Sequence, residues 1–131
     1  MTDVEILRPS CAPAAIGPYS PMIRVENMIW GSALAGVEPL TGVLGGETAY
    51  EQTVQALRLI SGMLEEVGSG LCQIVSVTVF LKDVVDFAEM NRAYVEAFGE
   101  HQPTRSVVSV VDLPKAGARL TMNFVAVTKV G

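Results

Sequence analysis

The sequence predicts an α+β fold in which two helices pack on one face of a mixed β-sheet. Its 131 residues suit a single domain spanning 1–131. Two stretches carry apolar residues three and four positions apart, which is typical of helices, and the stretches around them are rich in β-branched residues, which is typical of strands. The order is ββ-α-β-α-ββ, so we expect crossover helices between strands and a hairpin at each end of the chain.

The N-terminal third predicts an irregular segment followed by the first hairpin. Prolines at positions 9, 13, 18 and 21 interrupt residues 1–21 and disfavour a helix or regular strand pairing there. Two strands are predicted at 22–26 and 28–34, around a turn at Glu26-Asn27. Residues 35–46 are rich in glycine and should form a long loop.

The first helix is predicted over 50–67, where apolar residues recur along one face. Thr48 is the expected N-cap, although Gln52 lies four positions on and is therefore one residue outside the capping-box register. Gly68 should end the helix.

The second half of the chain predicts three strands and the other helix. The helix is expected over 86–99, capped by Asp83 or Asp86 and ended by Gly99. The predicted strands are 72–81, which is apolar on both faces and therefore central, 105–112 and 119–129.

Two helices on one face leave the other face of the sheet uncovered. Half of the residues are hydrophobic and only 18% are charged, which is apolar for a monomer of this length. We therefore expect a homo-oligomer that covers the second face. The apolar residues assigned to this face are Val77, Val79, Val108, Val110 and Phe124.

The charge and the rarity of metal-binding residues exclude several function classes. The net charge is −5 and no Lys/Arg cluster occurs, so neither nucleic acid nor an anionic membrane is an expected partner. His101 is the single histidine, and Cys11 and Cys72 have no adjacent base, so we expect inert thiols and no metal site. The sequence has neither a signal-peptide pattern nor an apolar run that could span a membrane, so a cytoplasmic location is expected.

Arg105 is the main candidate for a functional residue because it opens a strand that is otherwise nearly all valine. A guanidinium cannot lose its charge in such a place and needs an anion or several carbonyls as partner. One interpretation is a structural salt bridge with Glu100 or Asp112, and the other is a two-point grip on a ligand carboxylate. The single histidine leaves no Ser-His-Asp or Cys-His set for nucleophilic catalysis.

A series of spaced motifs resembles the Rid family of reactive-intermediate deaminases, also called the YjgF or L-PSP family. The similarity runs from about residue 12 to residue 127, through many short matches in one order. The matching segments are Ala12-Pro13-Ala14-Ala15-Ile16-Gly17-Pro18-Tyr19, Gly31-Ser32, Val77-Thr78-Val79-Phe80-Leu81-Lys82-Asp83, Asp86-Phe87-Ala88 with Asn91 and Tyr94, Pro103-Thr104-Arg105-Ser106 and Leu113-Pro114-Lys115.

The resemblance implies a chorismate-mutase-like fold, a homotrimer with clefts between subunits, and hydrolysis of imines and enamines derived from amino acids to a 2-oxo acid and ammonia. It implies that Arg105 holds the substrate carboxylate and that Tyr19, Ser32 and Asn91 line the cleft. Neither a metal nor an organic cofactor is implied.

Two positions depart from the pattern of the best-known deaminases. Val107 replaces a cysteine, although its backbone carbonyl can still orient a water molecule, and Thr121 replaces a glutamate that helps to place that water. Threonine can bind a water but cannot take its proton at neutral pH. The alternatives are a binding module for 2-oxo acids without turnover and a catabolic deaminase of an aminomuconate-like compound. A ribonuclease fits an acidic chain with one histidine poorly.

Overall fold

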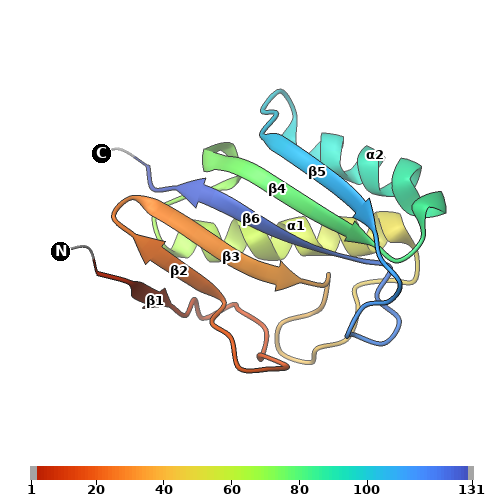
Figure 1. Cartoon of the computed structure of the whole chain (residues 1–131), viewed down its shortest axis with the longest axis horizontal. Coiled ribbons are helices and arrows are strands. Elements are labelled where there is room, and N and C mark those ends of the chain that lie inside the picture. Colours follow the sequence, from red (N-terminus) through yellow and green to blue (C-terminus); the bar gives the residue numbers. More distant parts are fainter. Residues whose placement is uncertain (1–2, 130–131) are drawn as a thin grey trace.

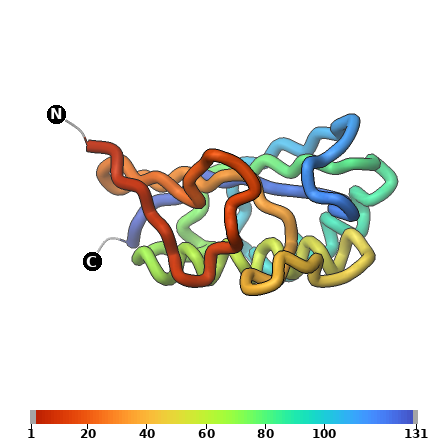
Figure 2. Tube along the Cα trace, turned by 90° about the horizontal axis from the view of Figure 1, so that it is seen from below, coloured from red at the N-terminus to blue at the C-terminus, as the bar shows by residue number. Residues whose placement is uncertain are grey.

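The computed structural model describes residues 3–129 as two layers, a six-stranded sheet and a pair of helices (Figure 1). Seen edge-on, both helices lie on the same side of the sheet (Figure 2). The α+β class, the mixed sheet and the helices on one face are therefore confirmed. The strands are β1 (Glu5–Leu7), β2 (Met22–Val25), β3 (Met28–Leu34), β4 (Ile74–Leu81), β5 (Thr104–Ser109) and β6 (Leu120–Val127), and the helices are α1 (Ala49–Glu66) and α2 (Phe87–Phe98).

The order of strands in the sheet is β1-β2-β3-β6-β4-β5. β2 and β3 form the predicted hairpin, and α2 connects β4 to β5, which runs parallel to it. The predicted second hairpin is wrong, because β6 does not pair with β5 but lies between β3 and β4, antiparallel to both. In this central place β6 has a hydrogen-bonding strand on each side and buries every second side chain under the helices.

The N-terminal segment is more ordered than the prolines suggest. Glu5–Leu7 forms a short edge strand that pairs with β2, so the prediction of an irregular segment over 1–21 is wrong for these residues. The physical reason is that the first proline comes at position 9, so the strand keeps all its N–H groups.

The helix caps were predicted in part. Thr48 is the N-cap of α1, as predicted, and it forms a capping box with the N3 residue Glu51, which was not named from the sequence. The Thr48 side chain accepts a hydrogen bond from Glu51 N, and the Glu51 carboxylate accepts one from Thr48 N, each at 3.1 Å. Asp83 caps the short 3-10 turn Val84–Asp86 before α2, whereas Asp86 makes no capping hydrogen bond.

Element boundaries move by one to three residues. Leu71–Gln73 forms a 3-10 turn, so β4 starts at Ile74 and not at 72. β5 ends at Ser109 and not at 112, because its neighbour β4 ends at the paired residue Leu81. β6 covers Leu120–Val127 within the predicted 119–129.

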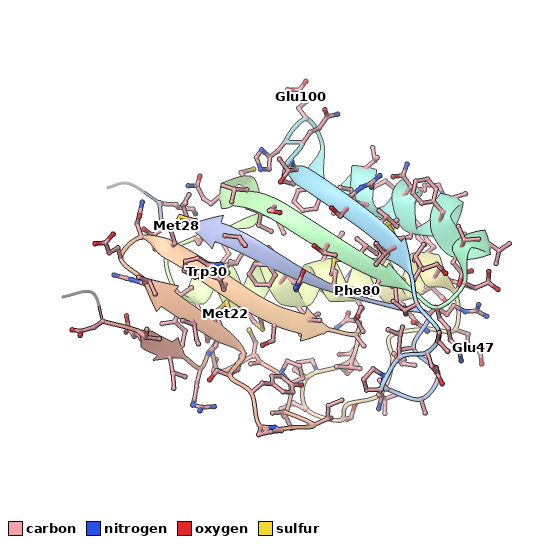
Figure 3. The ribbon with its side chains drawn as sticks, in the orientation of Figure 1. Met22, Met28, Trp30, Glu47, Phe80 and Glu100 are labelled. Atoms are coloured by element: carbon pink, nitrogen blue, oxygen red, sulfur yellow. The ribbon has the colours of Figure 1, made fainter. Side chains whose placement is uncertain are left out.

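The hydrophobic core lies between the sheet and the helices. Val77, Val79 and Phe124 are buried in it, so the prediction that they lie on the uncovered face is wrong. The error is one of strand parity, since successive side chains point to opposite faces and the sequence of β4 is apolar on both. The uncovered face, seen from the front in Figure 3, carries Trp30 and Phe80 instead. The residues paired with these two, Val125, Thr121 and Val108, lie on the same face. Val110 is partly buried beyond the end of β5.

Candidate active site at the edge of the sheet

Arg105 lies on β5, the edge strand of the sheet, opposite Val77. Because Val77 is buried under the helices, the Arg105 side chain points to the helix layer and meets α2. Its Nη1 donates a hydrogen bond of 2.7 Å to Asn91 Oδ1. Its guanidinium carbon lies 4.7 Å from the centre of the Tyr94 ring and 5.7 Å from the centre of the Phe87 ring. The structure thus brings Arg105 and Asn91 together, as expected from the resemblance of the sequence motifs to the Rid family.

The structure does not support the alternative of a salt bridge. Asp112 pairs with Lys82 at 3.5 Å, and the hydrogen bond from Leu113 N together with Lys82 lowers the pKa of its carboxyl group. None of the ion pairs formed within residues 3–129 includes Arg105 or Glu100. Arg105 therefore presents an uncompensated charge at the edge of the sheet.

A cavity of about 280 Å³ opens beside Arg105, between α2 and the segment that leads into β5. Its walls are mostly apolar, and its only histidine, His101, lies with Nε2 2.8 Å from Ile74 O. An apolar cavity with one charged group at its rim suits a small organic anion. The lining residues are Asn91, Tyr94, Val95, Phe98, Gly99, His101, Gln102, Pro103 and Arg105.

The backbone of Val107 faces the free edge of the sheet. In a strand, the N–H and C=O groups of one residue point to one side, and those of the next residue point to the other. Val110 N donates to Leu81 O of β4, so alternate residues of β5 bond to β4, and Arg105 and Val107 point away from it. The Val107 side chain itself packs against the core. Val107 thus offers a free carbonyl and a free N–H two residues after Arg105.

Tyr19 and Ser32 lie far from Arg105 within one chain. Ser32 on β3 donates through its hydroxyl to Ser20 O at 2.7 Å, so the two predicted residues share one neighbourhood. Tyr19 is 43% exposed. β6 and β4 separate β3 from β5, which corresponds to about 14 Å across three strand spacings.

Thr121 is also separated from Arg105. It lies on β6 opposite Phe80, on the uncovered face, whereas Arg105 points to the helix side. The structure therefore splits the predicted site residues into one group at β5 and α2 and a second group, Tyr19 and Ser32, at β3, with Thr121 in neither.

Phe87 and Tyr94 also contact Arg105, although from the sequence they were named only as part of the matching segments and were given no role in the site. The signal that could have found them is spacing, because residues 87, 91 and 94 are four and three positions apart and lie on one helix face. Tyr94 is 7% exposed and Phe87 is 39% exposed, so this face runs from the core to the surface beside Arg105.

Other reactive groups stand apart from this site. No three His, Cys, Asp or Glu side chains within residues 3–129 are grouped so that they could hold a metal ion. Burial, together with Glu66, raises the pKa of the Cys11 thiol, and Cys72 is exposed. In the described part of the chain, neither helix is long and apolar enough to cross a membrane.

Comparisons with known proteins show the family of this chain. The family model described as Endoribonuclease L-PSP matches residues 10–128. The chain belongs to the L-PSP family. This is the Rid or YjgF family that the sequence motifs resemble, so that prediction is confirmed.

Curated members of the L-PSP family resemble this chain over most of its length. A RutC family protein of Pyrococcus abyssi is 43% identical over 111 residues, which are 85% of this chain and 87% of that protein. The 2-iminobutanoate/2-iminopropanoate deaminase of Bos taurus is 36% identical over 123 residues, which are 94% of this chain and 89% of the relative. Names of relatives thus support imine deamination within this part of the family.

Solved structures of L-PSP family members share the fold. The crystal structure of E. coli TdcF with bound serine matches with a TM-score of 0.87 and 33% identity, and covers 95% of this chain and 99% of TdcF. The architecture of two helices on a mixed sheet is therefore common to both proteins.

Proposed function

We propose that this protein is a hydrolytic deaminase of reactive 2-imino and enamine acids, releasing a 2-oxo acid and ammonia. The observation that carries the proposal is Arg105, an exposed guanidinium held by Asn91 and two aromatic rings, without a carboxylate partner among residues 3–129. A planar guanidinium fits a carboxylate through two parallel hydrogen bonds. TdcF, a structural neighbour, binds serine, which also carries a carboxylate next to the carbon that bears nitrogen.

The reaction needs little from side chains once the substrate is oriented. Water adds its oxygen to the imine carbon, and a proton passes to the nitrogen, so a carbinolamine forms. The hydroxyl proton of the carbinolamine then passes to the nitrogen, the carbon–nitrogen bond breaks, ammonia leaves, and the 2-oxo acid remains. Because an imine is already electrophilic, positioning supplies much of the rate. The free carbonyl of Val107, two residues after Arg105, is the group we assign to hold the attacking water.

We further propose that the cleft is completed by a second copy of the chain in a homotrimer. Within one chain, Tyr19 and Ser32 lie about three strand spacings from Arg105, so they reach the same ligand only from a neighbouring subunit. Trp30 and Val108 remain 44% and 43% exposed on the uncovered face, which supplies an apolar surface for assembly. Any role of Thr121 also requires this second copy.

Variants at Arg105 test the carboxylate site. Titration calorimetry with pyruvate should show binding to wild type, and Arg105→Lys should bind about ten- to a hundredfold more weakly, because lysine keeps the charge but loses the two-point grip. Arg105→Ala should not bind measurably. Arg24→Ala is the matched control, since Arg24 on β2 contacts Glu26 O and Glu5 and not this site. Equal pyruvate affinity in all four proteins would end the assignment.

A binding module for 2-oxo acids is the second candidate, and Thr121 favours it, since this position lacks the carboxylate of the best-known deaminases. The test is ammonia release from 2-iminopropanoate, generated in the assay by an amino acid oxidase. An increase in the release rate that disappears in Arg105→Ala supports the enzyme. Pyruvate binding without any such increase supports the module. Aminomuconate-like substrates belong in the same assay.

The description of the family model names an endoribonuclease, so RNA is included as a separate test. The net charge of −5 gives RNA phosphates little attraction, and we expect no cleavage. Cleavage of single-stranded RNA that Arg105→Ala leaves unchanged would point to a different site.

A further inference from the structure

Three side chains of α2 lie next to the guanidinium of Arg105. Phe87, Asn91 and Tyr94 lie on one face of the helix, four and three positions apart. Asn91 accepts one hydrogen bond from Nη1, while the rings of Tyr94 and Phe87 lie 4.7 Å and 5.7 Å from the guanidinium carbon. The three side chains of α2 thus hold Arg105, which forms no ion pair within residues 3–129.

Tyr94 is the member of this group that is buried in the hydrophobic core. It is 7% exposed and belongs to the hydrophobic core, and its ring lies 4.5 Å from that of Phe98, measured between centres. Arg105, by contrast, is exposed on an edge strand, where a long side chain otherwise samples many rotamers. Contact with an immobile ring therefore restricts the guanidinium more than contact with a surface side chain would.

The Tyr94 hydroxyl does not explain this contact. It is buried and has no hydrogen-bond partner among the described residues. Burial raises the pKa of Tyr94, which the nearby Arg105 partly offsets, so the phenol stays neutral at physiological pH. The interaction with Arg105 is therefore one of a cation with a ring face, for which a phenylalanine ring would also serve.

We propose that Tyr94 is a positioning residue for the carboxylate site, with its ring face orienting the Arg105 guanidinium before a ligand arrives. Contact through the ring face leaves the N–H groups at the guanidinium edge, other than the one bonded to Asn91, free for a 2-oxo or 2-imino acid carboxylate. The inference rests on the proposed function and assigns Tyr94 a role in ligand affinity and not only in the core.

Two substitutions separate the ring from the hydroxyl. Tyr94→Phe keeps the ring and removes an unpaired hydroxyl, so it should bind pyruvate within about twofold of wild type. Tyr94→Leu removes the ring and should weaken binding about three- to tenfold, with a similar rise in KM for imine hydrolysis and a smaller change in kcat. Phe124→Leu is the control for lost core packing, because Phe124 is buried on β6, which β4 separates from the strand that carries Arg105. It should lower the melting temperature and leave pyruvate affinity unchanged.

Coupling to Arg105 is the decisive measurement. In an Arg105→Lys background, Tyr94→Leu should have a much smaller effect on affinity, since contacting residues are non-additive. A Tyr94→Leu variant that binds like wild type, a Tyr94→Phe variant as weak as Tyr94→Leu, or an effect undiminished in the lysine background would each overturn the proposal.

A second readout separates this proposal from the proposed function. The NMR resonance of the Arg105 Nε–H, assigned by its loss in Arg105→Lys, should be shifted by the Tyr94 ring in wild type and Tyr94→Phe, but not in Tyr94→Leu. If wild type shows this shift yet binds no 2-oxo acid, the function fails while the contact stands. If the Arg105 Nε–H resonance has the same chemical shift in Tyr94→Leu as in wild type, the positioning role fails.

Discussion

Gln52 on α1 is a completely buried polar residue, and its side-chain amide bonds to three backbone groups in two loops. Its Nε2 donates to Gly46 O at 3.0 Å and to Gly117 O at 3.2 Å, and its Oε1 accepts from Arg119 N at 2.8 Å. These bonds tie the loop before α1 to the loop before β6. A buried amide with such partners is a structural residue and not a spare functional group.

Gln52→Leu should lower the free energy of unfolding by about 2–4 kcal/mol, because three partly buried backbone groups would lose their partner. Urea denaturation at a fixed protein concentration measures the loss. The control is Gln55→Leu, a nearly buried residue of the same helix whose amide donates to one backbone carbonyl, Val37 O. It should lose about 1 kcal/mol. Equal losses in the two variants would contradict this account.

At the residue scale, the sequence identified Arg105 because a charge in a valine-rich strand stands out. It gave Tyr94 no role in the site, because an aromatic residue on the apolar side of a helix already has an explanation in the core. The structure shows that Tyr94 does both, packing on Phe98 and meeting Arg105. Contacts between a helix and a strand depend on how the two elements are placed, which local sequence patterns do not contain.

At the scale of elements, local signals predicted the helices and most strands, and non-local pairing was missed. α1 and α2 follow from apolar spacing and from glycines at their ends, where Gly68 and Gly99 have φ of 82° and 61°. The insertion of β6 between β3 and β4 depends on contacts far apart in sequence. The uncovered face was misassigned for the same reason, since the parity of β4 is set by which neighbours it meets.

The capping box of α1 makes a pH-dependent contribution to stability. Hydrogen bonds from Thr48 N, the Thr48 hydroxyl and Glu47 N lower the pKa of Glu51. A folded-state pKa below the unfolded value means that the ionised carboxylate favours the fold. The contribution is complete above a pH of about 4.3, the usual pKa of glutamate in an unfolded chain, and is lost as the pH falls through the folded value.

Glu51→Gln should therefore be less stable than wild type at pH 7, and the difference should shrink towards zero at pH 3. Urea denaturation of both proteins at pH 7, 5 and 3 checks it. Glu38→Gln serves as control, because the Glu38 side chain forms no hydrogen bond or ion pair within residues 3–129. A deficit of Glu51→Gln that stays constant from pH 7 to pH 3 would show that the charge is irrelevant.

At the scale of the whole molecule, one layer of helices covers one face of a sheet that is apolar on both. Half of the residues are hydrophobic, and Trp30 and Phe80 lie on the uncovered face (Figure 3). Val108, which pairs with Phe80, lies on it too. The same chain separates Arg105 from Tyr19 and Ser32. Association of copies through this face would explain both features, since it would bury the apolar surface and bring Arg105 of one copy close to Tyr19 and Ser32 of another.

Mixing inactive variants tests whether the cleft lies between subunits. Arg105→Ala and Tyr19→Ala should each lose deaminase activity, and light scattering should still give trimers, because Arg105 and Tyr19 are both exposed. Co-expressed in equal amounts, they should recover about one quarter of the wild-type activity, since a cleft needs Arg105 from one subunit and Tyr19 from its neighbour, each present with a chance of one half.

A mixture of equal amounts of wild type and the double variant Arg105→Ala/Tyr19→Ala is a second test of whether the cleft is shared between subunits or lies within one chain. A cleft shared between neighbours requires two wild-type subunits and again gives about one quarter of full activity, whereas a cleft within one chain gives about one half. The mixture of single variants gives nothing if each chain holds its own complete site. Recovery in that mixture, together with a quarter in the control, assigns Arg105 and Tyr19 to opposite sides of one interface. Monomers in light scattering would remove the basis for both expectations.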